Sequence, residues 1–283
     1  TRELPLPEGE RLVSVLNWRA ALGRRGETRF ADFARWRDEV RSLESVAAFH
    51  NVGRNLVTPN GSAEPITIAE MTPAGFTAAR VPALLGRSFN AQDARPGEPG
   101  VLVISHSAWQ TRFAGDPSVL GREVRLGERM HTIIGVMPPD FAFPVAHDYW
   151  VPLVETPALE QANPALAVFG RLAKGATMES AEAELATLGE RAAKDWPETH
   201  GQVRPRVMAY ARPFDGTDDV TWTWVALMQF LVTLLQVVVC ANVAILIYAR
   251  TVTRQGELAV RTALGASRRR IVGQLFLEAL VLA

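Results

Sequence analysis

Lysine and cysteine are almost missing from this chain of 283 residues. Lys174 and Lys194 are its two lysines, against 28 arginines, and neither is followed by Ser or Thr. A phosphate-binding loop of the G-x-x-x-x-G-K-S/T type needs that pair, because the amine contacts the phosphates and the hydroxyl contacts Mg²⁺. These residues therefore contain no such ATPase loop. The single cysteine, Cys240, excludes an internal disulfide framework and a cysteine-rich zinc site.

Net charge is also absent, because 30 basic and 30 acidic side chains cancel. This balance gives no reason to expect nucleic-acid binding. It is, however, the sum of two unlike regions. Residues 1–219 hold 24 basic and 28 acidic side chains, a net of −4, and all 18 prolines, whereas residues 220–283 hold six Arg and two Glu, a net of +4. The two regions are therefore predicted to lie in different surroundings.

No charged residue occurs from position 220 to 249. This run is longer than the roughly 20 apolar residues that cross a bilayer core. Trp222, Trp224 and Tyr248 stand near its ends, as in interfacial aromatic belts. The arginines that follow predict a cytoplasmic side, so residues 1–219 are expected outside the cytoplasm. We predict a transmembrane helix over 220–249; a buried helix of a soluble protein is the alternative.

Within this predicted span, four polar residues share one helix face. Gln229, Thr233, Gln236 and Cys240 follow the spacing i, i+4, i+7, i+11. A polar stripe in a bilayer normally contacts other helices, where amides find hydrogen-bond partners. The alternative is a substrate path through the membrane, but none of the four is readily ionised. We expect an inter-helix contact.

The next segments predict a return into the membrane. Residues 250–267 have helical spacing up to Gly265, which can end a short helix, and Ser267 can cap the next one. Residues 268–283 then begin another apolar run. The chain starts at Thr1 rather than Met, and this last run holds 13 residues from Ile271. We expect a fragment that begins after a first membrane helix and ends within a third.

Several motifs resemble one family in the expected order. QGELAVRTALGASRRRIVGQLFLEAL is similar to the cytoplasmic loop and third-helix start of MacB/FtsX-type ABC transporter permeases. The outer region resembles their MacB-like periplasmic core domain through MTPAGFTAARVPALLGRSFNAQD and VLVISHSAWQTRFAGDPSVLGREVRLGERMHTIIGVMPPDFAFP. The resemblance covers roughly residues 10–283. One departure is Ala79-Arg80, where the family usually has Leu-Gly.

This resemblance implies a permease chain that is not an enzyme. A separate ABC-type ATPase would hold ATP and Mg²⁺, and its conformational change would pass through the membrane helices to the outer domain, for export or mechanotransmission. Further expected partners are a second permease copy, as a homodimer or heterodimer, and membrane lipid. A periplasmic adaptor is an optional partner in this family. The expected location is the bacterial cytoplasmic membrane. We expect no cofactor or metal in this chain.

The coupling to the ATPase is expected in the short cytoplasmic helix. Its apolar side chains would enter a groove of the ATPase, and an arginine would add a charged contact. The residues of this expected contact are Glu257, Leu258, Val260, Arg261, Leu264 and Gly265. Two alternatives remain: a membrane-anchored binding or sensor module without an ATPase, and a tethered hydrolase with Ser105 and His106 as first suspects.

For residues 1–219 we predict an α+β fold with two subdomains. Helices are expected over 29–49 and from Thr177 to before Pro197, and Thr72 and Ser105 are expected to cap two more. Gly127 lies in a hairpin signal. The strands are expected at 66–69, 102–104, 123–126, 130–136, 168–172 and 203–210. The five histidines show no metal-ligand spacing.

Overall fold

The computed structural model describes residues 6–57, 63–210 and 219–253, and the single positions 256, 263 and 273. The chain divides into two compact units, Thr1–Gly216 and Thr217–Ala283. The first unit is a mixed α/β domain. The second contains one long helix, α7 (Asp219–Thr253).

One large sheet organises the first unit. Its strands follow the order β11-β1-β10-β3-β4-β9-β6-β8-β5, with β2 paired to β1 and β7 paired to β3 and β8. All described pairings are antiparallel except β4 with β9 and β6 with β8. The strands are β1 (Leu12–Arg19), β2 (Arg24–Arg25), β3 (Leu43–Val57), β4 (Ala63–Met71), β5 (Leu85–Gly86), β6 (Gly100–Ile104), β7 (Glu123–Leu126), β8 (Arg129–Val136), β9 (Tyr149–Pro152), β10 (Ala167–Leu172) and β11 (Val203–Ala209).

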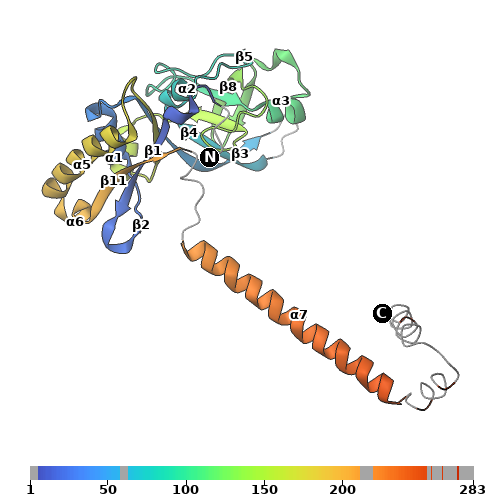
Figure 1. Cartoon of the computed structure of the whole chain (residues 1–283). Helices are drawn as coiled ribbons and strands as arrows, with labels where there is room; N and C mark the ends of the chain where they lie inside the picture. The colour runs from blue at the N-terminus through green and yellow to red at the C-terminus, as the bar shows by residue number, and fades with distance from the viewer. Residues whose placement is uncertain are drawn as a thin grey trace. The chain divides into compact units, whose positions relative to one another are not determined.

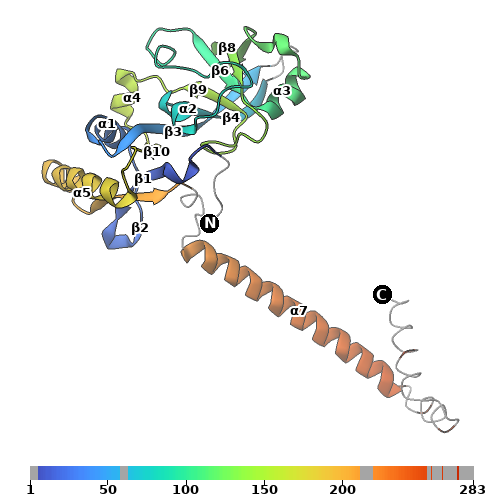
Figure 2. The same cartoon turned by 45° about the horizontal axis from the view of Figure 1, so that its top comes forward.

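The helices cover different parts of this sheet. In both views α1 and α5 lie together at one end of the domain, and α3 lies at the other end (Figures 1 and 2). The α-helices of this unit are α1 (Phe30–Glu39), α2 (Ala74–Ala79), α3 (His106–Phe113), α4 (Pro157–Ala162), α5 (Met178–Asp195) and α6 (Pro197–His200), and the 3-10 helices are Gly9–Arg11, Ala20–Leu22 and Pro117–Val119.

Alternation along the strands builds the core. In β1, Val13 points to the cluster under α1 and α5, while its neighbour Leu12 joins a cluster on the other face that includes Phe76 of α2. A third cluster lies around β6, β8 and α3. The α+β class is confirmed. The two expected subdomains correspond to the two ends of one continuous sheet, each with its own helices and core.

Several local predictions are confirmed. Ser105 caps α3 and Thr177 caps α5, each through its side-chain oxygen. The hairpin of β7 and β8 turns at Gly127, whose φ of 60° suits glycine. Thr72 behaves differently from the prediction. Its hydroxyl accepts a hydrogen bond from the Ala48 amide at 3.0 Å, and α2 begins after Pro73 without a side-chain cap.

The helix predicted over 29–49 is wrong in its second half. The helix ends at Glu39, and β3 begins at Leu43. The Glu184 carboxylate accepts hydrogen bonds from the amides of Arg41 and Ser42, at 2.8 and 2.9 Å, and so fixes the turn between them. The first half of β3, up to Phe49, pairs with β10, and the second half pairs with β4, so the segment predicted as helix joins the sheet instead.

Helix α7 differs from every helix of the first unit. It contains an apolar stretch of 27 residues, Thr223–Ala249, in which a window of 18 residues has a mean hydropathy of 2.6 and is fully exposed. A helix of this length and composition can cross a membrane. Among the described residues it is the only one that meets this description.

Candidate functional site

The predicted coupling contact lies outside the described residues. This holds for Glu257, Leu258, Val260, Arg261, Leu264 and Gly265. The predicted polar stripe lies on α7, where Gln229, Thr233, Gln236 and Cys240 are all exposed. The Thr233 hydroxyl donates to the Gln229 carbonyl of the previous turn at 2.8 Å. The role of both sets stays a prediction.

The Ser105–His106 pair is not arranged as a nucleophile and its base. The Ser105 hydroxyl donates to the Asp148 carboxylate and accepts from the Ala108 amide, while the His106 ring packs against Trp109 at 5.5 Å. In the part of the chain that the structure describes, no group of three or more His, Cys, Asp or Glu residues could hold a metal ion.

The N-terminal and C-terminal strands of the domain pair with each other. The first long strand, β1, pairs along its length with the last strand, β11, so that Val13 lies opposite Ala209. The Tyr210 amide then donates to the Leu12 carbonyl at 3.0 Å. Figure 1 shows this pairing as a blue strand beside an orange one. Residues far apart in the sequence thus leave the sheet from neighbouring points.

Tyr210 fastens the end of β11 to the core. Its ring lies 5.1 Å from that of Phe143 and 5.6 Å from that of Phe169. Its hydroxyl donates to the Pro144 carbonyl. Burial raises the pKa of the Tyr210 phenol, so the group stays neutral and acts as a donor. The chain continues from this anchor toward α7, which begins at Asp219.

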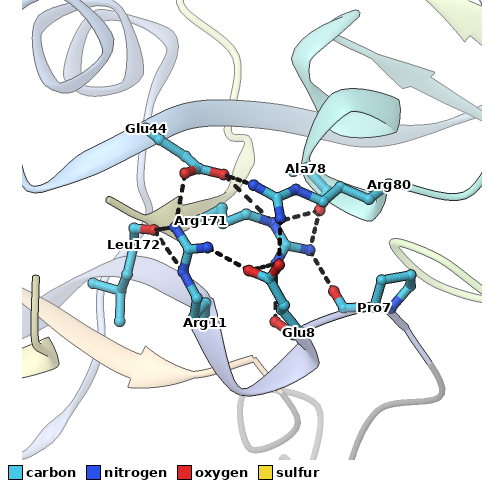
Figure 3. A network of polar contacts seen from close by, with 8 residues as sticks. All are labelled: Pro7, Glu8, Arg11, Glu44, Ala78, Arg80, Arg171 and Leu172. Atoms are coloured by element: carbon cyan, nitrogen blue, oxygen red, sulfur yellow. Dashed lines mark hydrogen bonds and ion pairs between the residues drawn. The ribbon is translucent and has the colours of Figure 1, made fainter. Parts of the chain in front are cut away.

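Arg171 fastens the other end, the N-terminal segment (residues 6–11). It lies in β10 and is fully buried. Its guanidinium donates to the Ala78 carbonyl at 2.9 Å, the Glu8 carbonyl at 2.9 Å and the Pro7 carbonyl at 3.0 Å (Figure 3). Burial lowers its pKa, since the charged form loses water. One side chain thereby joins this segment to the end of α2.

Two carboxylates compensate the buried charge of Arg171, and each also pairs with two further arginines. Glu8 and Glu44 lie 4.0 and 3.9 Å from the Arg171 guanidinium. Arg80 contacts Glu8 at 2.8 Å and Glu44 at 2.7 Å, and Arg11 pairs with both carboxylates as well. The hydrogen bond from Arg11 holds the pKa of the Glu8 carboxyl below its usual range, with smaller effects from Arg80 and Arg171. We call these five residues the arginine network.

The backbone of this network is strained at two positions. Arg80 has a φ of 54° and Glu8 a φ of 50°, both in the left-handed region that favours glycine. Arg80 ends α2 at the position where a glycine is common. This explains the departure at Ala79-Arg80: the chain accepts the strain and gains a side chain that links Glu8 to Glu44. The network therefore ties the N-terminal segment to α2, β3 and β10 together.

Comparison with known proteins agrees with this fold. The family model of the MacB-like periplasmic core domain matches residues 2–188. A crystal structure of a domain from a permease protein of Porphyromonas gingivalis has a TM-score of 0.54 and 19% identity, over 72% of this chain and 92% of that one. The crystal structure of the periplasmic region of MacB from Actinobacillus actinomycetemcomitans has a TM-score of 0.54 and 16% identity. The match covers 74% of this chain and 95% of that one.

A search of curated proteins found no significant match. The two crystal structures share too little identity to show more than the fold, but the family model spans well over half of the chain. Both sources agree with the resemblance carried by the sequence motifs. The chain therefore belongs to the family defined by the MacB-like periplasmic core domain.

Proposed function

We propose that this chain is the permease component of an ABC transporter of the MacB/FtsX type. In this proposal it passes ATP-driven movement from a cytoplasmic ATPase to its outer domain, for export or mechanotransmission. The observation that carries the proposal is the pairing of β1 with β11, because it joins both ends of the domain in one sheet. The chain that follows β11 leads to an apolar helix of membrane-spanning length.

The sheet offers a direct route for such movement. β1 lies between β11 and β10, and it is hydrogen-bonded to both. A displacement of the N-terminal segment acts on Arg171 in β10, and a displacement after β11 acts on Tyr210. Strands joined by backbone hydrogen bonds move together more readily than they slide, since sliding breaks the register. The domain would therefore tilt or shift as a unit.

The other parts of the proposal concern the membrane side. The helix around Arg261 and Leu264 would dock in the ATPase. The polar stripe of α7 would contact another membrane helix, from this permease or from a second copy. Residues 1–219 would lie outside the cytoplasmic membrane of a bacterium, and lipid would surround the rest of α7. ATP and Mg²⁺ would bind to the partner alone.

The test uses the permease in nanodiscs with an ABC-type ATPase from the same organism as the candidate partner. The ATPase rate is measured with and without the permease, for the natural chain and for Arg261→Ala/Leu264→Ala. We expect the permease to change the rate and the double variant to abolish that change. Arg250→Ala/Val252→Ala removes the same kinds of side chain outside the expected contact, and it should behave as the natural chain.

Two results would count against the proposal. If the natural permease neither binds this ATPase nor changes its rate, the chain is a binding or sensor module with a membrane anchor. If Arg261→Ala/Leu264→Ala keeps full ATPase stimulation and transport, the coupling contact lies elsewhere.

A further inference from the structure

A second set of arginines gathers at the far end of β1. Backbone register places Arg25 of β2 and Arg204 of β11 on either side of Trp18. Arg206 lies two residues beyond Arg204 on the same face, and its guanidinium lies over the Trp18 ring at 4.9 Å. All three arginines are exposed. We call these four residues the arginine face.

The other face of β11 is already covered. A Cβ added to Gly189 of α5 would lie 2.5 Å from the Pro205 side chain, so α5 packs closely on that side. Val207 belongs to the same buried cluster as Leu185 of α5. The arginines that alternate with Pro205 and Val207 must therefore point away from α5.

None of these arginines has a carboxylate partner among the described residues. Arg204 contacts only the carbonyls of Gly201 and Val203, at 3.3 and 2.9 Å. Two other exposed arginines of the domain are paired: Arg87 binds both oxygens of Asp93, and Arg112 binds both oxygens of Glu64. Within the described part of the chain, no carboxylate thus compensates the positive charge of the arginine face.

The rim of this surface adds a repulsive pair. Arg19 and Arg24 lie directly opposite each other on β1 and β2, and like charges in this arrangement destabilise a strand pair. Both are exposed and neither has an ion pair within the described chain. A sequence that breaks a local rule without a gain in the fold points to a role outside the fold.

We propose that the arginine face and its rim bind an acidic segment of a second protein outside the cytoplasm. Guanidinium groups bind carboxylates through two parallel hydrogen bonds, which a lysine cannot do. Three of them around an aromatic ring match a segment with closely spaced Glu or Asp. The occupant is therefore identified by its chemistry: closely spaced carboxylates on a protein chain.

The arginine face is confined to one end of β1. It lies at the opposite end of β1 from Leu12, where Tyr210 leads the chain toward α7. The eight residues of β1 span about 25 Å at the usual rise of a strand. Recognition would use side chains rather than strand addition, because Pro205 in the middle of β11 has no N–H to donate.

The test measures peptide binding by the complete chain in nanodiscs of uncharged phosphatidylcholine. The probe is a fluorescein-labelled peptide of alternating Glu and Ser, followed by fluorescence anisotropy. In Arg25→Gln/Arg204→Gln/Arg206→Gln we expect binding to weaken by about tenfold or more, because several charge-assisted hydrogen bonds are lost. The corresponding Lys variant keeps the charge and should still bind more weakly than the natural chain.

A matched control removes three exposed arginines from the region of β7 and β8, none of which forms an ion pair with another described residue. This control is Arg122→Gln/Arg125→Gln/Arg129→Gln. Its affinity for the peptide should stay within about twofold of that of the natural chain, since the substitutions change only the overall electrostatic field of the protein. Equal losses in both triple variants, or no binding by the natural chain, would overturn the proposal.

A second measurement tests binding of the chain to vesicles of phosphatidylglycerol. If they bind the arginine face and the peptide does not, the surface is a lipid contact and the proposal is wrong. The ATPase rate of each variant with its partner is recorded in the same nanodiscs. It should match that of the natural chain, so failure of this inference is distinct from failure of the proposed function.

Discussion

The domain contains two groups of arginines that differ in ion pairing and in whether one member is buried. In the arginine network three arginines share Glu8 and Glu44, and one of them is fully buried. In the arginine face the side chains are exposed and have no carboxylate partner among the described residues. Buried charge must be compensated inside the protein, whereas exposed charge is solvated by water and is accessible to a binding partner. The first group is therefore expected to stabilise the fold and the second to bind.

Removing the buried member should give the largest effect. Arg171→Met removes the guanidinium that donates to the carbonyls of Pro7 and Ala78 and leaves the Glu8 carbonyl with the Arg11 amide alone. It also leaves Glu8 and Glu44 with less positive charge nearby. We expect a loss of about 3–5 kcal/mol in the free energy of unfolding. Chemical denaturation of the complete chain in nanodiscs measures it, and hydrogen exchange of residues 6–11 should increase.

The matched variant is Arg206→Met, which removes the same side chain from the arginine face. It should change the free energy of unfolding by at most about 0.5 kcal/mol, because substitutions of exposed side chains without buried partners have small effects. Similar losses in both variants would erase the distinction between the two groups.

A smaller effect is expected at Arg80, where strain and ion pairing oppose each other. Arg80→Ala loses the contacts with Glu8 and Glu44 and keeps the left-handed backbone. Arg80→Gly loses the same contacts but relieves the strain, so it should be more stable than the Ala variant by about 1 kcal/mol. Thermal unfolding compares the two. If Ala and Gly are equally stable, the φ of 54° is not a source of strain.

The sequence predicted most elements of this domain because their signals are local. The caps Ser105 and Thr177 and the turn at Gly127 depend on neighbouring residues alone. The segment after Glu39 could not be assigned in this way. Leu43 and Val46 satisfy a helical spacing, but Ala47 and Ala48 are fully buried too, on opposite faces of β3. A strand that is buried on both faces hides its period of two.

The two arginine groups were missed for a different reason. Arg171 stands in the apolar stretch AVFGRL, and an arginine in such a strand is a signal of paired burial. Its partners, however, come from positions as distant as Pro7 and Ala78. The arginine face likewise depends on the register of β11 with β1. Neither partner set follows from spacing along the chain.

Acid should weaken the network and leave the arginine face unchanged. The pKa of Glu8 is lowered in the fold, so its stabilising effect is present above about 4.5, the ordinary value for glutamate, and it is lost as the pH falls through the folded value. Glu8→Gln should therefore unfold at a lower temperature than the natural chain at pH 7, and this gap should close on acidification. A gap that is constant with pH would contradict the ion pairing.

Salt provides the control for this comparison. The Glu8 side chain is 45% exposed, so its contacts with Arg11 and Arg80 are screened in part. The gap between Glu8→Gln and the natural chain should shrink in high salt at pH 7. Arg206→Met, which touches no carboxylate, should show no change with pH between 7 and the acid range.

The smallest effect has the opposite sign, and it separates the two groups most sharply. Arg24→Glu turns the like-charge pair with Arg19 into an ion pair across β1 and β2. The domain should become more stable, by about 0.2–1 kcal/mol, as measured by thermal unfolding. The same substitution should weaken binding of the acidic peptide. A variant that stabilises the fold while it weakens binding indicates that Arg24 serves the partner rather than the fold, whereas loss of both stability and binding would assign it to the fold.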